Sequence, residues 1–243
     1  MNAKSLKILP SAPVLAISLL ASPALHAQSA VDDRWHYEAS PYVWAAGIDG
    51  TNKIGGITTE SANKDLFNGI DFGAAGTFEA RRGRWGVLFD ATYIELSDDA
   101  STSQGKVKLK LTQQLYSLGG AWRALEGPAP IDLIAGVRYN YLKPKIEGVT
   151  AGVERSYDSF DPYVGVRGLY PLSNQWSLVG YVDVGTYGGS DTAWQLIAGA
   201  NYAIDANKSI KFGYRRLETK YSKNAFEADS TTQGLYLGMG FRF

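Results

Sequence analysis

The sequence predicts an all-β protein, a transmembrane antiparallel up-and-down β-barrel of about ten strands, with eight strands as the alternative. Three observations support this prediction. Apolar and polar residues alternate with a period of two in about ten segments of the 243-residue chain. Aromatic residues gather near the ends of these segments, and short connections alternate with longer ones. The mean hydropathy of −0.17 suits a soluble protein, but an average over two unlike strand faces conceals the alternation.

Composition removes several classes of protein. The 24 basic and 24 acidic side chains balance, which argues against a nucleic-acid partner. The absence of cysteine excludes disulfides, thiolate metal sites and a cysteine nucleophile. Beyond residue 27 no stretch approaches the ~18 to 20 apolar residues of a membrane-spanning helix. The 27 Gly, 15 Tyr, 9 Phe and 6 Trp exceed what a generic domain of this size carries.

Residues 1–27 have the pattern of a secretory signal peptide. Two lysines precede an apolar run, and small residues close the segment at Ala27. We expect cleavage near Ala27, which leaves residues 28–243 as one outer-membrane β-barrel domain. An N-terminal amphipathic helix is the alternative, but the apolar run has no polar face. Export without a retained apolar helix is compatible with the periplasm, secretion or an outer membrane.

The strands follow in chain order. From Ile70 to Arg81 the even positions are mainly apolar and the odd positions mainly polar, and Arg82-Gly83-Arg84 then predicts a hairpin turn. The alternation resumes at Trp85. Two segments are ambiguous: 36–48 has aromatic residues on both faces, and between Lys106 and Trp122 the phase shifts, which predicts a β-bulge or a strand that extends beyond the membrane. Clear alternation recurs at 85–93, 133–141, 164–170, 176–184, 194–202, 210–215 and 234–243.

The polar faces distinguish a barrel from a soluble sandwich. They are rich in Gly, Ser, Ala and Tyr with scattered single charges, whereas a face in open water favours long polar residues. The aromatic residues form two expected belts one strand-length apart, as in transmembrane barrels. One belt comprises Trp85, Trp122, Tyr170, Trp176, Tyr202, Phe241 and Phe243, and the other comprises Tyr93, Tyr139, Tyr141, Tyr187, Trp194 and Tyr214.

The connections also alternate in length, as expected for short periplasmic turns and longer extracellular loops. Short ones are expected near 82–84, 124–130, 171–175 and 205–208, and mostly longer ones near 51–69, 97–105, 143–156, 188–192 and 222–229. Within the first long connection, 61–69 starts with a cap-like serine and ends with glycine, so a short helix and an irregular loop are equally expected.

The C-terminal stretch 234–243 carries a resemblance to known proteins. Apolar or aromatic residues alternate up to a terminal phenylalanine, at Leu235, Leu237, Met239, Phe241 and Phe243. With the signal peptide, this resembles the assembly signal of small Gram-negative outer-membrane β-barrels of the OmpA and OmpW type, as does the hairpin from Phe72 to Leu96. The resemblance implies a bacterial outer-membrane location, contacts with lipid and lipopolysaccharide, and recognition of the last strand by the barrel-assembly machinery. It assigns no activity.

Catalysis is not expected. Enzymes of this architecture resemble one another in using a histidine base, and the one histidine after residue 27 is His36, at the start of the first strand. Acidic residues cluster only at Asp98-Asp99, so neither a metal site nor a cofactor is expected.

Charges on the polar faces are the candidate functional residues. They allow two interpretations: a narrow passive pore for small solutes, and a salt-bridged interior in a structural barrel. A surface adhesin or receptor that displays its loops is the alternative function. Three lysines alternate along one expected strand, at Lys106, Lys108 and Lys110. We expect them either to contact lipopolysaccharide phosphates or to form a solvated strand face. Of the expected lumen charges, Glu79, Asp90, Arg138 and Arg167 are the strongest candidates, and the full set is Glu38, Asp71, Glu79, Arg81, Asp90, Arg138, Arg167, Asp183, Lys211, Arg215 and Arg242.

Overall fold

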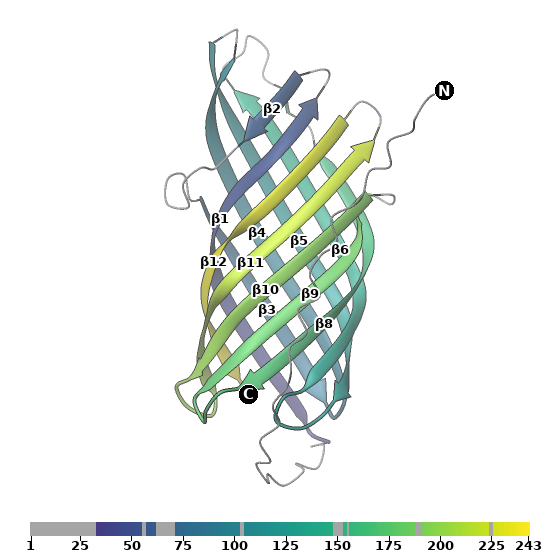
Figure 1. Ribbon diagram of the computed structural model, residues 1–243, viewed down its shortest axis with the longest axis vertical. Helices are drawn as coiled ribbons and strands as arrows, with labels where there is room; N and C mark the ends of the chain where they lie inside the picture. Colours follow the sequence, from purple (N-terminus) through teal and green to yellow (C-terminus); the bar gives the residue numbers. More distant parts are fainter. Residues whose placement is uncertain are drawn as a thin grey trace, which may run out of the picture.

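The chain forms a closed antiparallel β-barrel of ten long strands (Figure 1). The structure is a computed structural model, and it describes residues 33–54, 57–61, 71–102, 105–147, 153–154, 156–187, 191–223 and 226–243. The predicted signal peptide lies outside these residues. Within the described ranges, no helix is long and apolar enough to cross a membrane.

Neighbouring strands in the sequence are neighbours in the wall, which gives the predicted up-and-down order. The barrel closes where the last strand pairs with the first, so ten strands is confirmed and eight is wrong. Two short strands, β2 (Ile57–Ser61) and β7 (Val153–Glu154), pair with β1 and β6 respectively. The wall consists of β1 (Trp35–Ile54), β3 (Asp71–Arg82), β4 (Trp85–Thr102), β5 (Gly105–Leu125), β6 (Ile131–Glu147), β8 (Tyr157–Pro171), β9 (Trp176–Tyr187), β10 (Asp191–Ala203), β11 (Lys208–Lys223) and β12 (Phe226–Arg242).

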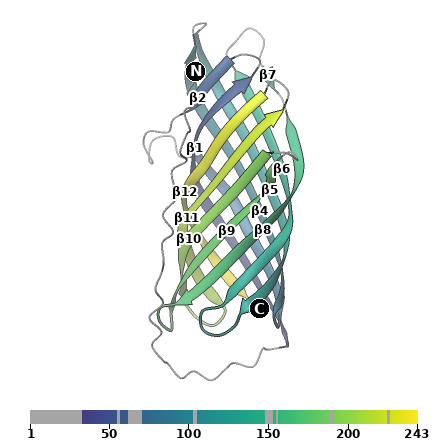
Figure 2. The same cartoon turned by 45° about the vertical axis from the view of Figure 1, so that its right-hand side comes forward.

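Short turns join the strands at the end of the barrel where the C-terminus lies (Figure 1). The predicted hairpin at 82–84 is confirmed: Arg82 pairs with Trp85, and Gly83 has a φ of 58°, a conformation that favours glycine. Turned by 45°, the wall remains closed and its strands tilt across the barrel axis (Figure 2). We call this end the short-turn end.

The expected bulge between Lys106 and Trp122 is wrong. The β4–β5 pairing runs without a shift from Thr102–Gly105 to Trp85–Trp122, and the register shift between β5 and β6 lies at Arg123/Leu125. The alternation of polar and apolar residues is interrupted in this segment because an apolar residue, Leu115, faces the interior and is 1% exposed. With 21 residues, β5 is longer than the ~9 to 11 that cross a bilayer. The possible helix at 61–69 lies outside the described residues except for Ser61, which ends β2.

The outer face of the wall is apolar. Val87 and Phe89 on β4, like Val164 and Val166 on β8, are 40–58% exposed, although water disfavours such a surface. Aromatic residues join across strands near the short-turn end, where Trp85 pairs with Trp122 and Trp176 pairs with Tyr202. Nearer the other end, the ring centroids of Tyr139 and Phe160 lie 4.8 Å apart. An apolar band between aromatic belts is the surface that a bilayer covers.

Candidate functional site: the barrel lumen

Three groups of charged side chains occupy the lumen: two lie side by side near the short-turn end, where Glu38 pairs with Glu79, and the third lies further in. The first, the mouth network, consists of Glu38, Ser40, Lys211 and Arg242. Glu38 on β1 accepts hydrogen bonds from the Lys211 ammonium and, at 2.6 Å, from Arg242 Nε. Lys211 reaches Glu38 across β12 because Gly240 has no side chain: a Cβ there would lie 2.8 Å from Lys211 Cε. The mouth network therefore holds two cations and one carboxylate.

The second group, the basal network, joins three arginines to two carboxylates. It consists of Glu79, Arg81, Arg123, Asp132 and Arg167. Arg167 on β8 forms salt bridges of 2.7 Å with both Glu79 and Asp132, and so crosses from β8 to β3. Arg81 bonds the same two carboxylates at 2.8 Å, and Arg123 bonds Asp132 at 3.0 Å. Charge-assisted bonds of this kind fix the geometry of both partners.

The third group, the mid-barrel network, crosses the lumen. Arg138 on β6 donates to both carboxylate oxygens of Asp183, at 3.1 and 2.7 Å. Gln195 joins the two halves, since it donates to Asp183 at 3.1 Å and accepts from Arg215 Nε at 2.9 Å. Arg215 also donates to Asp90 at 3.1 Å. The network is completed by Ser117, which binds Arg138, and by Tyr42 and Thr92, which bind Arg215.

Glycines on neighbouring strands make room for two lumen tyrosines. A Cβ at Gly119 would lie 2.5 Å from the Tyr163 hydroxyl, and one at Gly136 would lie 2.9 Å from the Tyr163 ring. Tyr236 lies in the same way against Gly199 and Gly213. The Arg138 guanidinium lies 4.8 Å from the centre of the Tyr163 ring, within the range of a cation–π interaction. The surplus of glycine and tyrosine in the composition thus serves the packing of the interior.

Beyond the mid-barrel network an apolar layer fills the barrel. We call it the apolar plug: Trp44, Ala46, Ile94, Leu115 and Leu217, each 0–1% exposed. Leu115 on β5 and Leu217 on β11 come from opposite sides of the ten-strand wall. The Arg215 guanidinium lies 4.8 Å from the centre of the Trp44 ring, so the plug rests directly on the mid-barrel network.

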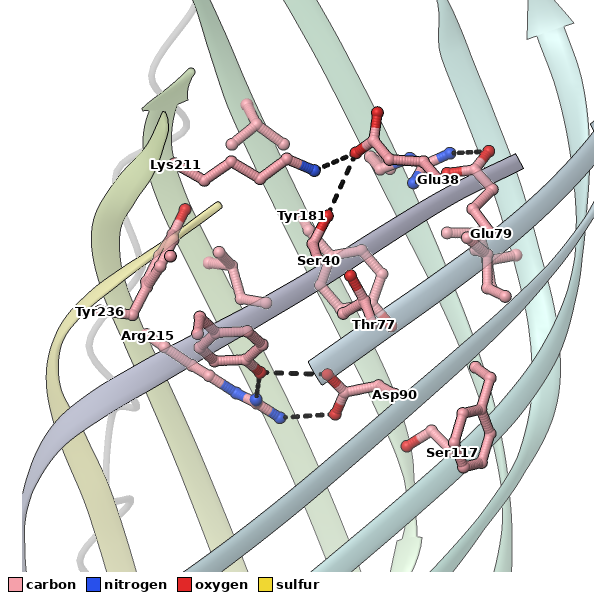
Figure 3. Close-up of a pocket in the computed structure, with 18 of the residues that line it drawn as sticks. Glu38, Ser40, Thr77, Glu79, Asp90, Ser117, Tyr181, Lys211, Arg215 and Tyr236 are labelled. Atoms are coloured by element: carbon pink, nitrogen blue, oxygen red, sulfur yellow. Dashed lines mark hydrogen bonds and ion pairs between the residues drawn. The ribbon is translucent and has the colours of Figure 1, made fainter. Parts of the chain in front are cut away.

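A cavity of about 250 Å³ lies between the mouth and the mid-barrel network. Figure 3 shows Lys211 and Glu38 in contact at one level and Arg215 and Asp90 in contact at another. Between these levels the lining is apolar on one side, where Leu169, Val179 and Ile197 come from the adjacent strands β8, β9 and β10. The lumen is thus open in part near the short-turn end and packed further in.

The structure brings most of the predicted lumen charges into these networks. Asp71 lies in β3, but its side chain is outside the described part of the chain, as are those of Lys106 and Lys108. Two interior carboxylates were not predicted from the sequence: Asp132, in the basal network, and Asp161, which is 1% exposed and accepts a hydrogen bond from Asn140 at 3.0 Å. Asp132 lies one residue before the predicted segment 133–141, and Asp161 lies three residues before 164–170. Both lie on the polar faces that carry Arg138 and Arg167, so slightly longer segments include them. Trp44 was missed because both faces of 36–48 carry aromatic residues.

Metal binding and catalysis depend on two further observations. In the described ranges, no group of three or more His, Cys, Asp or Glu is placed to hold a metal ion. His36 is exposed in β1, at the register position of Arg81. The expectations that the protein is no enzyme and has no cofactor stay predictions.

Comparisons with known proteins support the fold. No family model matches the chain, and no curated protein matches it significantly. The Escherichia coli outer membrane protease OmpT is similar in structure, with a TM-score of 0.59 at 11% identity over 86% of this chain and 97% of OmpT. A major outer membrane protein of Thermus thermophilus also matches, with a TM-score of 0.45, 15% identity and coverage of 86% and 100%. OprG of Pseudomonas aeruginosa matches with a TM-score of 0.41, 13% identity and coverage of 89% and 98%.

The likeness to OmpT is one of fold alone. Together with the closed ten-strand wall and the apolar exterior, it defines the class of fold: the chain has the fold of the small outer-membrane β-barrels.

Proposed function

We propose that the protein is a structural barrel of the bacterial outer membrane that does not conduct solutes. One observation carries the proposal: the apolar plug and the mid-barrel network cross the lumen, and Trp44, Leu115, Arg215 and Leu217 are each 0–1% exposed. A pore needs a continuous water path lined by groups that solvate the solute. Barrels of about this size are filled by side chains, whereas porins of 16 to 18 strands keep a channel. A closed structural barrel is therefore favoured over a narrow pore.

The outer face of β12 supports the proposed assembly and lipid contacts. Four outward-facing side chains of β12 and the residue that follows the strand are 36–71% exposed: Leu235, Leu237, Met239, Phe241 and Phe243. This arrangement would present the predicted signal to the barrel-assembly machinery. Lipopolysaccharide binding and the display of loops as an adhesin or receptor remain predictions, because residues 103–104, 148–152, 188–190 and 224–225 lie outside the described part of the chain.

Planar-bilayer recording of the refolded protein tests the proposal. Wild-type protein should give no unitary current steps. A variant with Trp44→Ala and Arg215→Ala truncates the two largest fully buried side chains among the described residues and should give current steps. Leu118→Ala, which truncates an outward-facing side chain of β5, is the matched control and should stay silent. Frequent steps from wild-type protein would show that the lumen conducts and would contradict the proposal.

A further inference from the structure

We propose that the lumen cavity is a binding site for a small amphipathic organic anion, an apolar ring or short chain that carries a carboxylate. The inference goes beyond the proposed function. It concerns the space between the mouth and the mid-barrel network and holds whether or not the apolar plug seals the barrel.

The charge of the lining points to an anion. The ionised side chains around the cavity comprise five cations and three carboxylates, an excess of two positive charges. Opposite charge in a cleft with low-dielectric walls raises the local concentration of the matching ion. The cations are Arg138, Arg167, Lys211, Arg215 and Arg242, and the carboxylates are Glu38, Glu79 and Asp90.

The mouth network supplies donors for the carboxylate. Arg242 is 55% exposed and bonds Glu38 through Nε, and its two terminal nitrogens make no hydrogen bond with a described residue. Lys211 bonds Glu38, and an ammonium has three protons to donate. A guanidinium binds a carboxylate with two parallel hydrogen bonds, which suits Arg242. By contrast, Arg167 already bonds two carboxylates through all three of its nitrogens.

The apolar wall supplies the other half of the site. Leu169 pairs with Val179 across β8 and β9, and Ile197 on the adjacent strand β10 adds a third apolar side chain to the cavity lining. Most small-molecule sites combine such surface with a few placed polar groups. The cavity, at about 250 Å³, is smaller than the ~300 Å³ that begins the range of drug-sized pockets, so the ligand is small.

A fluorinated probe series tests the inference on the refolded full-length barrel in lipid nanodiscs. The probes are 4-fluorophenylacetate, its neutral amide, and the cation 4-fluorophenethylamine, followed by fluorine NMR against empty nanodiscs. We expect the anion to bind at least tenfold tighter than the amide and the cation not to bind. Equal affinity for anion and amide, preference for the cation, or no binding above empty nanodiscs would overturn the proposal.

Variants locate the site. Lys211→Gln and Arg242→Gln should each weaken binding of the anion about tenfold and leave the amide unchanged. Glu38→Gln removes the competing carboxylate and should tighten anion binding, an effect that loss of structure would not produce. Arg82→Gln, at the same end but paired with exposed Asp33, is the matched control and should have no effect. Anion binding that is insensitive to both Lys211→Gln and Arg242→Gln would place the site elsewhere and refute the proposal.

Discussion

Replacing Arg138 by methionine should destabilise the barrel more than any exposed charge replacement. The Arg138 and Asp183 side chains are 4% and 0% exposed. Without Arg138, Asp183 keeps the hydrogen bond that the neutral Gln195 side chain donates, but it loses its counter-charge. Removing one partner of a buried ion pair costs about 3–5 kcal/mol, and the hydrogen bond that remains from Gln195 places this case toward the lower end of that range.

A double-mutant cycle separates the ion pair from the packing. Arg138→Met with Asp183→Leu keeps the combined volume close to that of the wild type and removes both charges, so it should cost less than about 1.5 kcal/mol. Arg82→Met, at the exposed pair with Asp33, is the control and should cost at most ~1 kcal/mol. Equilibrium urea unfolding in phospholipid vesicles, followed by tryptophan fluorescence and heat-modifiable gel migration, measures the two single variants Arg138→Met and Asp183→Leu, the double variant and the control. A cost below about 1 kcal/mol for Arg138→Met, or a double variant as unstable as the two single changes added, would refute the reasoning.

Three further predictions use the same unfolding measurement or a titration. Gly136→Ala should lower the free energy of unfolding by about 1–3 kcal/mol, because its Cβ would lie 2.2 Å from the Leu118 carbonyl oxygen. Gly168→Ala is the control and should be close to neutral, since a Cβ there meets nothing within 4 Å. Similar costs for the two variants would contradict the packing. Trp44→Ala should cost about 3–5 kcal/mol by leaving a void in the apolar plug, and a loss below about 1 kcal/mol would mean that the plug is not packed. In the turns, Arg84 donates a hydrogen bond to Glu126, which lowers the pKa of the Glu126 carboxyl. The ion pair is therefore intact above the ordinary carboxyl pKa and is lost as the pH falls through the lowered pKa. Arg84→Gln should return that pKa to its ordinary range, and NMR titration of Glu126 that shows no change would disprove the contact.

The wall of the barrel follows from local patterns in the sequence. Alternation with a period of two identifies which face of each strand is polar, and that face lines the lumen. A glycine such as Gly83 marks a turn. These signals lie within a few residues of one another, so they need no knowledge of the final diameter. The connections expected to be long at 97–105 and 222–229 are mostly strand, since β4 runs to Thr102 and β12 begins at Phe226.

The interior networks depend on geometry that the sequence does not contain. Arg138 and Asp183 lie 45 positions apart on strands separated by β8, and Arg167 reaches Glu79 across 88 positions. Which charges meet depends on the register of every strand between them and on the barrel diameter. The cavity and the plug could not be predicted for the same reason, since Trp44 and Leu115 are apolar residues on faces that are otherwise polar.

Thiol labelling tests the closed lumen most directly, because the chain has no cysteine of its own. Single-cysteine variants in nanodiscs, where both barrel ends are accessible, would be exposed to a small water-soluble methanethiosulfonate, with the denatured protein as the reference for full labelling. We predict rapid labelling of Asn201→Cys, which lines the cavity, and no labelling of Leu217→Cys, in the apolar plug. Labelling of Leu217→Cys at the rate of Asn201→Cys would show that water passes the plug and would contradict a closed barrel.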